Sequence, residues 1–194
     1  MFVALYIDHE LIRRRSWLVR SFGTLTDQVQ PYFPIAVCLG VSAFFIAAAS
    51  YGGFLLTPEL ETDAAWVPPA HLGIAVLVLL PRTAFLAGLG MAALYVHAIS
   101  QFGLYHLLDY PIFLGVASYI IIISLLGERY ADIALDVMRW CTGITLLWAG
   151  IEKFAFPEWS FGLLNAEPGI TFGFGAEFYM VAAGFVEFCC AYLL

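Results

Sequence analysis

The segment from Tyr32 to Leu56, YFPIAVCLGVSAFFIAAASYGGFLL, contains no charged side chain. A transmembrane α-helix needs about 20 consecutive, predominantly apolar residues. Pro31 and Pro34 stand where such a helix would begin, and Tyr51-Gly52-Gly53 stands where it would end. The segment therefore predicts a membrane-spanning helix.

The composition of the whole chain extends this prediction. Hydrophobic residues make up 62% of the 194 residues and charged residues 12%, and the mean hydropathy is +0.89. A water-soluble core of this size cannot bury so much apolar surface. We therefore expect an integral membrane protein that is embedded in the lipid bilayer. The net charge of −7 is spread through loops and helix ends, so nothing supports nucleic-acid binding.

Apolar segments of helical length predict an all-α, polytopic bundle of about six spans. The second segment is short and needs residues 64–69 to complete its crossing. A single kinked helix over residues 71–100 is the alternative, and it would invert the later topology. The predicted spans are 32–56, 71–80, 83–104, 111–126, 133–154 and 174–194.

The basic residues predict the orientation of these spans. If the N-terminus is cytoplasmic, all seven arginines fall on the cytoplasmic side and only Lys153 falls elsewhere. Residues 1–30, which carry four of these arginines, would be a cytoplasmic segment that either lies on the inner leaflet or only sets the topology. Residues 31–138 would then form a four-helix membrane region and residues 139–194 a helical hairpin.

Ionisable residues in the spans are the candidates for function, because a carboxylate there is costly unless it is paired, protonated or hydrated. Glu152 and Glu187 are the main candidates. Lys153 points about 100° away from Glu152 around the same helix. For Glu187, a hydrogen bond that only joins two helices is the alternative to proton or quinone chemistry. The predicted topology places further titratable residues in the outer half of the membrane or at its outer surface: His71, His97, His106, Asp109 and Glu177.

We expect His71, His106 and Glu177 to be interfacial and hydrated. His97 lies deeper in its span. On a continuous helix His97 and His106 would point about 180° apart, so they cannot both ligate one heme iron. No helix carries a His/Glu spacing typical of a metal site, and the cysteines form no CxxC pair. Heme and metal are therefore disfavoured.

The last 56 residues carry a loose motif, R-x3-G followed by A-G-x-x-K-x3-P and then a second apolar segment with an acidic residue near a glycine. The matching positions are Arg139, Gly143, Ala149, Gly150, Lys153, Pro157 and Glu187. This motif resembles the opening hairpin of the DoxX and DoxD group of small membrane proteins. The resemblance implies a redox-associated protein of the bacterial inner membrane with a link to quinone. In contrast to that group, four predicted helices precede the hairpin here.

Three functions remain open. The first is quinone-linked electron transfer, alone or in a respiratory-type redox complex, with quinone as cofactor. The catalytic residues would be Glu152, Lys153 and Glu187, and the cofactor-binding residues would be His97, Trp148 and Glu177. The second is an accessory structural subunit that packs against other membrane redox subunits. The third is a proton-coupled carrier of a small solute, which a weak internal repeat between residues 82–111 and 139–168 favours.

Overall fold

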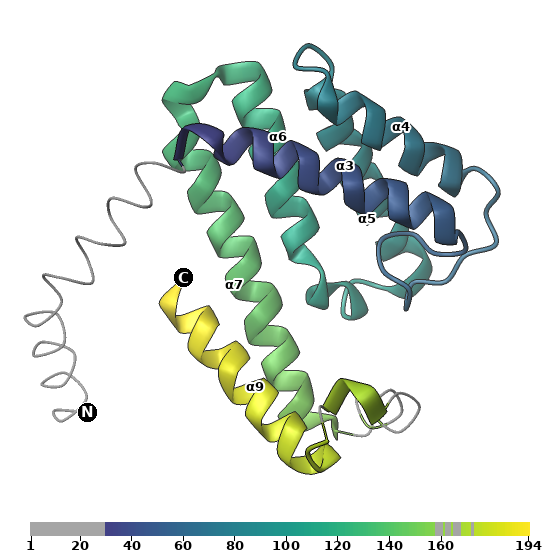
Figure 1. Cartoon of the computed structure of the whole chain (residues 1–194), viewed down its shortest axis with the longest axis vertical. Coiled ribbons are helices and arrows are strands. Elements are labelled where there is room, and N and C mark those ends of the chain that lie inside the picture. The colour runs from purple at the N-terminus through teal and green to yellow at the C-terminus, as the bar shows by residue number, and fades with distance from the viewer. Residues whose placement is uncertain (1–29, 158–160, 162–163, 165–167, 172) are drawn as a thin grey trace, which may run out of the picture. The chain divides into compact units, whose positions relative to one another are not determined.

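The computed structural model describes residues 30–157, 161, 164, 168–171 and 173–194 of the chain. This part of the protein is helical, and its only extended pairing is an isolated antiparallel bridge between Phe54 and Glu61. The prediction of an all-α protein is confirmed (Figure 1). The predicted segment 1–30 lies outside the described residues except for Gln30.

Long helices occupy all six predicted segments. They are α3 (Phe33–Tyr51), α4 (Val67–Leu79), α5 (Ala84–Phe102), α6 (Pro111–Leu126), α7 (Ala131–Ala155) and α9 (Ala176–Leu193). Short 3-10 turns precede or connect some of them: η1 (Gln30–Tyr32), η2 (His106–Asp109), η3 (Glu128–Tyr130) and η4 (Pro168–Thr171). The alternative of one kinked helix over residues 71–100 is wrong, because residues 80–83 leave the helical conformation between α4 and α5.

Two boundaries differ from the prediction for local reasons. The first helix ends at Tyr51 rather than Leu56, because Gly52 and Gly53 adopt φ angles of 65° and 76° that terminate a helix. The second begins at Val67 rather than His71. Prolines occupy its first turn, where the missing N–H has no helical partner to lose.

Within the described part of the chain, three helices are long and apolar enough to cross a bilayer: Gln30–Tyr51, Ala84–Phe102 and Ala176–Leu193. Val67–Leu79 and Pro111–Leu126 are apolar but shorter. The helix α7 has the length, yet it carries charged residues near both ends: Asp132, Asp136, Arg139, Glu152 and Lys153. The number of spans and the side on which the N-terminus lies stay predictions.

The chain divides into two compact units, residues 1–40 and 41–194. In the second unit, successive helices pack on one another: α4 on α5, α5 on α6, α6 on α7 and α7 on α9 (Figure 1). Its largest fully buried side chains are Phe45, Leu55, Leu56, Leu60, Val67, His71, Val78, Met91 and Leu107.

A small buried hairpin replaces the predicted end of the first helix. The backbone N–H of Leu55 donates to the carbonyl of Leu60 at 2.9 Å, and that of Thr62 donates to Gly53 at 2.8 Å. His71 is also fully buried, and its Nε2 lies 2.7 Å from the carbonyl oxygen of Leu55. The expectation that His71 is interfacial and hydrated is wrong, because this hairpin covers it.

Candidate acid–lysine site

Glycines bring α7 and α9 close enough for their charged side chains to meet. A Cβ at Gly184 would lie 2.9 Å from the Phe154 ring, and one at Gly150 would lie 3.1 Å from the Phe188 ring. Any larger residue would push the helices apart. Gly150 belongs to the sequence motif, so the structure supplies a packing reason for that glycine.

Lys153 on α7 and Glu187 on α9 form an ion pair in this hairpin. The Nζ of Lys153 lies 2.8 Å from Oε1 of Glu187, and the two side chains are 22% and 23% exposed. Lys153 also donates to the carbonyl of Ala149 at 3.3 Å. The structure thus brings together two of the three predicted catalytic residues and gives each a partner of opposite charge.

Glu152, the third predicted catalytic residue, faces a different neighbour. Its carboxyl group interacts with that of Asp109, which lies at the end of η2. A hydrogen bond between two carboxyl groups requires a proton on one of them. Burial, the charge of Glu152 and its hydrogen bond raise the pKa of Asp109 to about 7, while nearby Lys153 lowers it. Near neutral pH, a substantial fraction of Asp109 is therefore protonated.

A tyrosine extends these contacts toward the surface. The hydroxyl of Tyr110 donates to Oε2 of Glu59, an exposed residue in the buried hairpin's connecting turn. Burial and the hydrogen bond to Glu59 raise the pKa of Tyr110, so the phenol stays protonated and keeps donating. The negative charge of Glu59 also acts on Asp109. Asp109 therefore interacts electrostatically with a group in contact with solvent.

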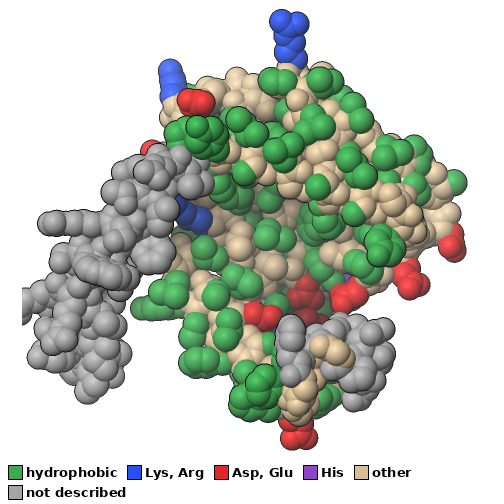
Figure 2. All heavy atoms as spheres, viewed as in Figure 1, with side chains coloured by type: hydrophobic (Ala, Val, Ile, Leu, Met, Phe, Trp, Pro, Cys, Tyr) green, Lys and Arg blue, Asp and Glu red, His purple; other side chains and the backbone are tan. Residues whose placement is uncertain are grey.

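We call this set of side chains the acid–lysine cluster: Glu59, Asp109, Tyr110, Glu152, Lys153 and Glu187. The cluster contains four carboxyl groups and one lysine. Two of their oxygens, Oδ1 of Asp109 and Oε2 of Glu187, are buried without a hydrogen-bond partner among the described residues. Figure 2 shows several acidic side chains close together in the lower half of the view. The cluster can hold, accept and release a proton at Asp109, and it offers a part-buried cation, Lys153, to a negatively polarised oxygen.

Trp148 lies close to this cluster. It stands one turn before Glu152 on α7, so the two side chains share a helix face. Its ring meets that of Tyr105, directly before η2, edge to face at 4.8 Å between centroids. The predicted cofactor-binding residue Trp148 therefore lies on the same helix face as Glu152, and its cofactor role stays a prediction.

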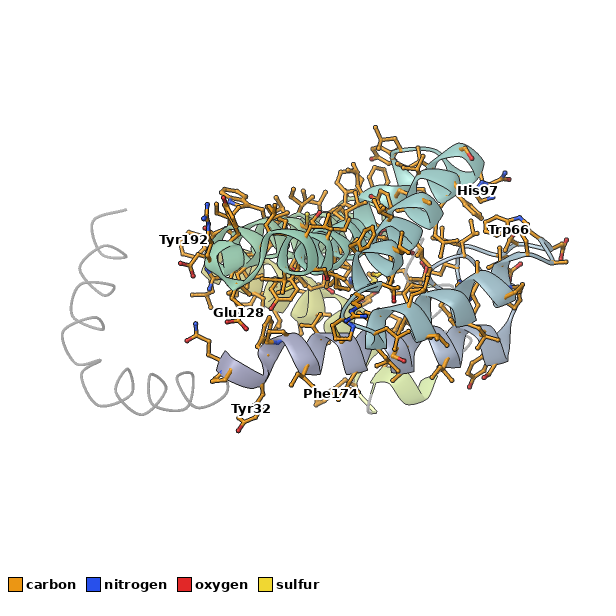
Figure 3. All side chains as sticks on the ribbon, turned by 90° about the horizontal axis from the view of Figure 1, so that it is seen from above. Tyr32, Trp66, His97, Glu128, Phe174 and Tyr192 are labelled. Carbon is orange, nitrogen blue, oxygen red and sulfur yellow. The ribbon has the colours of Figure 1, made fainter. Side chains whose placement is uncertain are left out.

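The other two predicted cofactor-binding residues have different surroundings. The half-buried His97 packs its ring 5.2 Å from that of Trp66 (Figure 3). Glu177 is exposed in the first turn of α9. No contact in the described part of the chain joins either side chain to the acid–lysine cluster, so their cofactor role stays a prediction. His106 is also exposed, as expected of an interfacial residue.

The sequence did not reveal the roles of Asp109, Tyr110 and Glu59. The available signal was topological, because Glu59 and Asp109 fall on the same side of the predicted membrane as Glu152 and Lys153. Neither spacing nor residue type indicates which of these groups meet. Among the described residues, no group of three or more His, Cys, Asp or Glu side chains is arranged to hold a metal ion.

Comparison with known proteins identifies no relative: no protein-family model, no curated protein and no solved structure matches this chain. The resemblance of residues 139–194 to the DoxX and DoxD group therefore stays a prediction. The geometry of the acid–lysine cluster carries the functional argument.

Proposed function

We propose that this chain is a six-span protein of the bacterial inner membrane, with a cytoplasmic N-terminus, that exchanges protons with a quinone in redox-linked electron transfer. It would act within a quinone-dependent oxidoreductase. The observation that carries the proposal is the proximity of the Asp109 and Glu152 carboxyl groups, with the pKa of Asp109 raised to about 7, beside the Lys153–Glu187 ion pair.

The exposed surface of α9 supports the membrane placement. Four large apolar side chains of this helix, Phe178, Val181, Phe185 and Val186, are each more than half exposed. Water would disfavour such a continuous apolar face, whereas the hydrocarbon of a bilayer accommodates it. Because α9 is helical from Ala176 to Leu193, the backbone N–H and C=O groups in its interior are hydrogen-bonded within the helix, as a spanning segment requires.

The chemistry of quinone fits the groups in the cluster. Reduction of a quinone to a quinol takes up two electrons and two protons. Asp109, whose pKa is raised to about 7, can deliver one proton at a time and be reprotonated from solvent between the two transfers. Lys153 can stabilise negative charge on a quinone oxygen, and Trp148 gives the ring an apolar neighbour. The electrons would come from a partner redox subunit.

The test compares quinol formation in membranes that contain the wild-type chain, Glu152→Gln or Glu187→Gln. Loss of a general acid typically lowers a rate by about 100-fold or more, so we expect a drop of that order with folding intact. Glu128→Gln, which changes an exposed acid in η3, is the matched control. We also expect quinone in an extract of the purified protein. Unchanged quinol formation in both cluster variants would overturn the proposal.

A proton-coupled solute carrier is the second candidate. The observation that favours it is that side-chain exposure decreases across the cluster, from the exposed Glu59 to the largely buried Lys153–Glu187 pair. A proton relay has this arrangement of titratable groups. Liposomes that contain the purified chain would then take up protons or solute in a manner that depends on Glu152. Tight liposomes would exclude this function. An accessory subunit without chemistry would instead tolerate Glu152→Gln with no loss of electron transfer.

A further inference from the structure

A groove runs between α7 and α9 at the end opposite the acid–lysine cluster. Its volume is about 600 Å³. On α7 it is lined at a three-to-four-residue spacing, which places the lining on one helix face. The lining residues that matter here are Arg139, Gly143, Ile144 and Leu147 on α7, and Ala191 and Tyr192 on α9. From Arg139 to Leu147 the groove follows the helix axis for about 12 Å.

The groove is apolar along its length and charged at one end. Small side chains at Gly143 and Ala191 leave room between the helices, and Ile144 and Leu147 form a wall that is nearly half exposed. At the charged end, Nη1 of Arg139 lies 3.0 Å from Oδ1 of Asp136. A guanidinium has five N–H donors, so this contact leaves others for a second oxyanion.

The aromatic residues at this end indicate its depth in a membrane. Trp140 and Tyr192 flank the charged end and are 75% and 90% exposed. Tryptophan and tyrosine concentrate at the interface between lipid headgroups and hydrocarbon. In the proposed topology this end also lies on the cytoplasmic side. Arg139 would therefore stand at the level of the phosphates of the inner leaflet.

We propose that this groove binds a phospholipid, with its phosphate on Arg139 and one acyl chain between α7 and α9. Arginine binds phosphate oxygens in a bidentate manner, and basic pockets between membrane helices on the cytoplasmic side recognise lipid headgroups. Asp136 lines the same end and balances the charge of Arg139, so the attraction to the phosphate comes from the N–H donors of Arg139 that Asp136 leaves free, and the apolar walls match the chain. The inference rests on the membrane placement proposed above and is independent of quinone chemistry.

This groove is separate from the acid–lysine cluster. Arg139 and Lys153 are fourteen residues apart on one helix, which corresponds to about 21 Å. A quinone whose ring meets Lys153 cannot also meet Arg139. The two ends of the hairpin therefore bind different molecules, and a variant at one end should leave the other unaffected.

The test is native mass spectrometry of the purified full chain with a mixture of phosphatidylethanolamine, phosphatidylglycerol and a ubiquinone analogue. Wild type should retain one phospholipid. Arg139→Gln should lower retention at least tenfold, and Ile144→Trp should do the same because the indole fills the groove. Matched controls are Arg82→Gln, at an exposed arginine, and Ile133→Trp, at an exposed α7 position outside the groove; both should retain the lipid.

Equal retention in Arg139→Gln and wild type would overturn the proposal, as would a retained mass that corresponds to the quinone. Because the Arg139 side chain is 54% exposed, its substitution should leave folding intact. If Ile144→Trp does not fold, lipid retention by Arg139→Gln alone tests the proposal. Glu152→Gln should retain the lipid. Failure of the quinone proposal would therefore leave this result unchanged.

Discussion

The segment from Val41 to Leu126 and the α7–α9 hairpin are stabilised in different ways. The first contains all the largest fully buried side chains, from Phe45 to Leu107. In the hairpin, α7 buries only Ala134 and Gly150, and α9 buries only Met180 and Gly184. The first region is held by apolar packing, whereas glycine contacts and an ion pair join the two helices of the hairpin.

This difference means that the residues that stabilise the fold and the charged residues of the candidate site lie mostly in different regions. A densely packed core disfavours charged groups, because each one must be desolvated. The sparsely packed hairpin leaves large apolar side chains of α9 exposed and accommodates charged residues on both helices, Glu187 in the interior of α9 among them. The tightly packed region contributes Asp109, Tyr110 and Glu59 from turns at its edge. The first region therefore supplies three of the six residues of the cluster from its edge, and the hairpin supplies the other three.

The largest expected effect tests the core side of this comparison. Leu60→Ala removes a side chain with 0% exposure from the buried hairpin and should lower the free energy of unfolding by about 2–5 kcal/mol. Phe185→Ala on α9, where the ring is 64% exposed, should change it by about 0.5 kcal/mol or less. Unfolding by denaturant in detergent measures both. Equal losses of unfolding free energy in the two variants would contradict the proposed difference between the packed region and the hairpin.

The second prediction concerns the ion pair of the α7–α9 hairpin. Lys153→Met leaves the largely buried Glu187 without its cation and should cost about 1–3 kcal/mol of unfolding free energy. Adding Glu187→Leu should restore most of that loss, because removing both charges also removes the desolvation cost. The same unfolding assay gives the coupling as a double-mutant cycle. Additive effects would show that the two charges do not interact.

The third prediction is a pH dependence that separates Asp109 from ordinary surface acids. Its pKa is about 7 in the folded protein and 3.8 as an ordinary aspartate, so the folded state binds more protons between these values. Its contribution to stability is full below about pH 4 and is lost as the pH rises through 7. Asp109→Asn should therefore gain stability relative to wild type between pH 5 and pH 8.

Thermal unfolding at pH 5 and pH 8 measures this gain. Glu128→Gln, at an exposed acid, is the control and should show no such change. A difference between Asp109→Asn and wild type that does not vary with pH would contradict the raised pKa of Asp109.

The smallest expected effect is at the edge of the cluster. Tyr110→Phe removes the hydrogen bond to the exposed Glu59 and should cost about 1 kcal/mol or less. If Glu59 supplies protons through this contact, quinol formation should fall several-fold while stability hardly changes. A change in stability without a change in rate would limit Tyr110 to a structural role.

The helices could be predicted because apolar runs bounded by proline, glycine and charge define them locally. The buried hairpin at residues 53–62 could not. Phe54, Leu55 and Leu56 continue an apolar run, and only the positive φ angles of two glycines turn it back. His71 was misjudged for the same reason, since a tertiary element covers it.

Part of the candidate site was also predictable. The cost of charge in a span singled out Glu152, Lys153 and Glu187, and their position on two helices allowed them to meet. The partners depend on how each helix is rotated. That rotation places Lys153 toward α9 and Glu152 toward η2, and the sequence alone gives no measure of it.

The most direct test of the account is redox-induced infrared difference spectroscopy of the purified chain with bound quinone. A protonated carboxyl group absorbs separately from carboxylates, so the proton of the Asp109–Glu152 pair is observable. We predict a carboxyl band at neutral pH that shifts when quinone is reduced and disappears in both Asp109→Asn and Glu152→Gln. A carboxyl spectrum that does not respond to quinone reduction, or a band that persists in both variants, would contradict the proposed function.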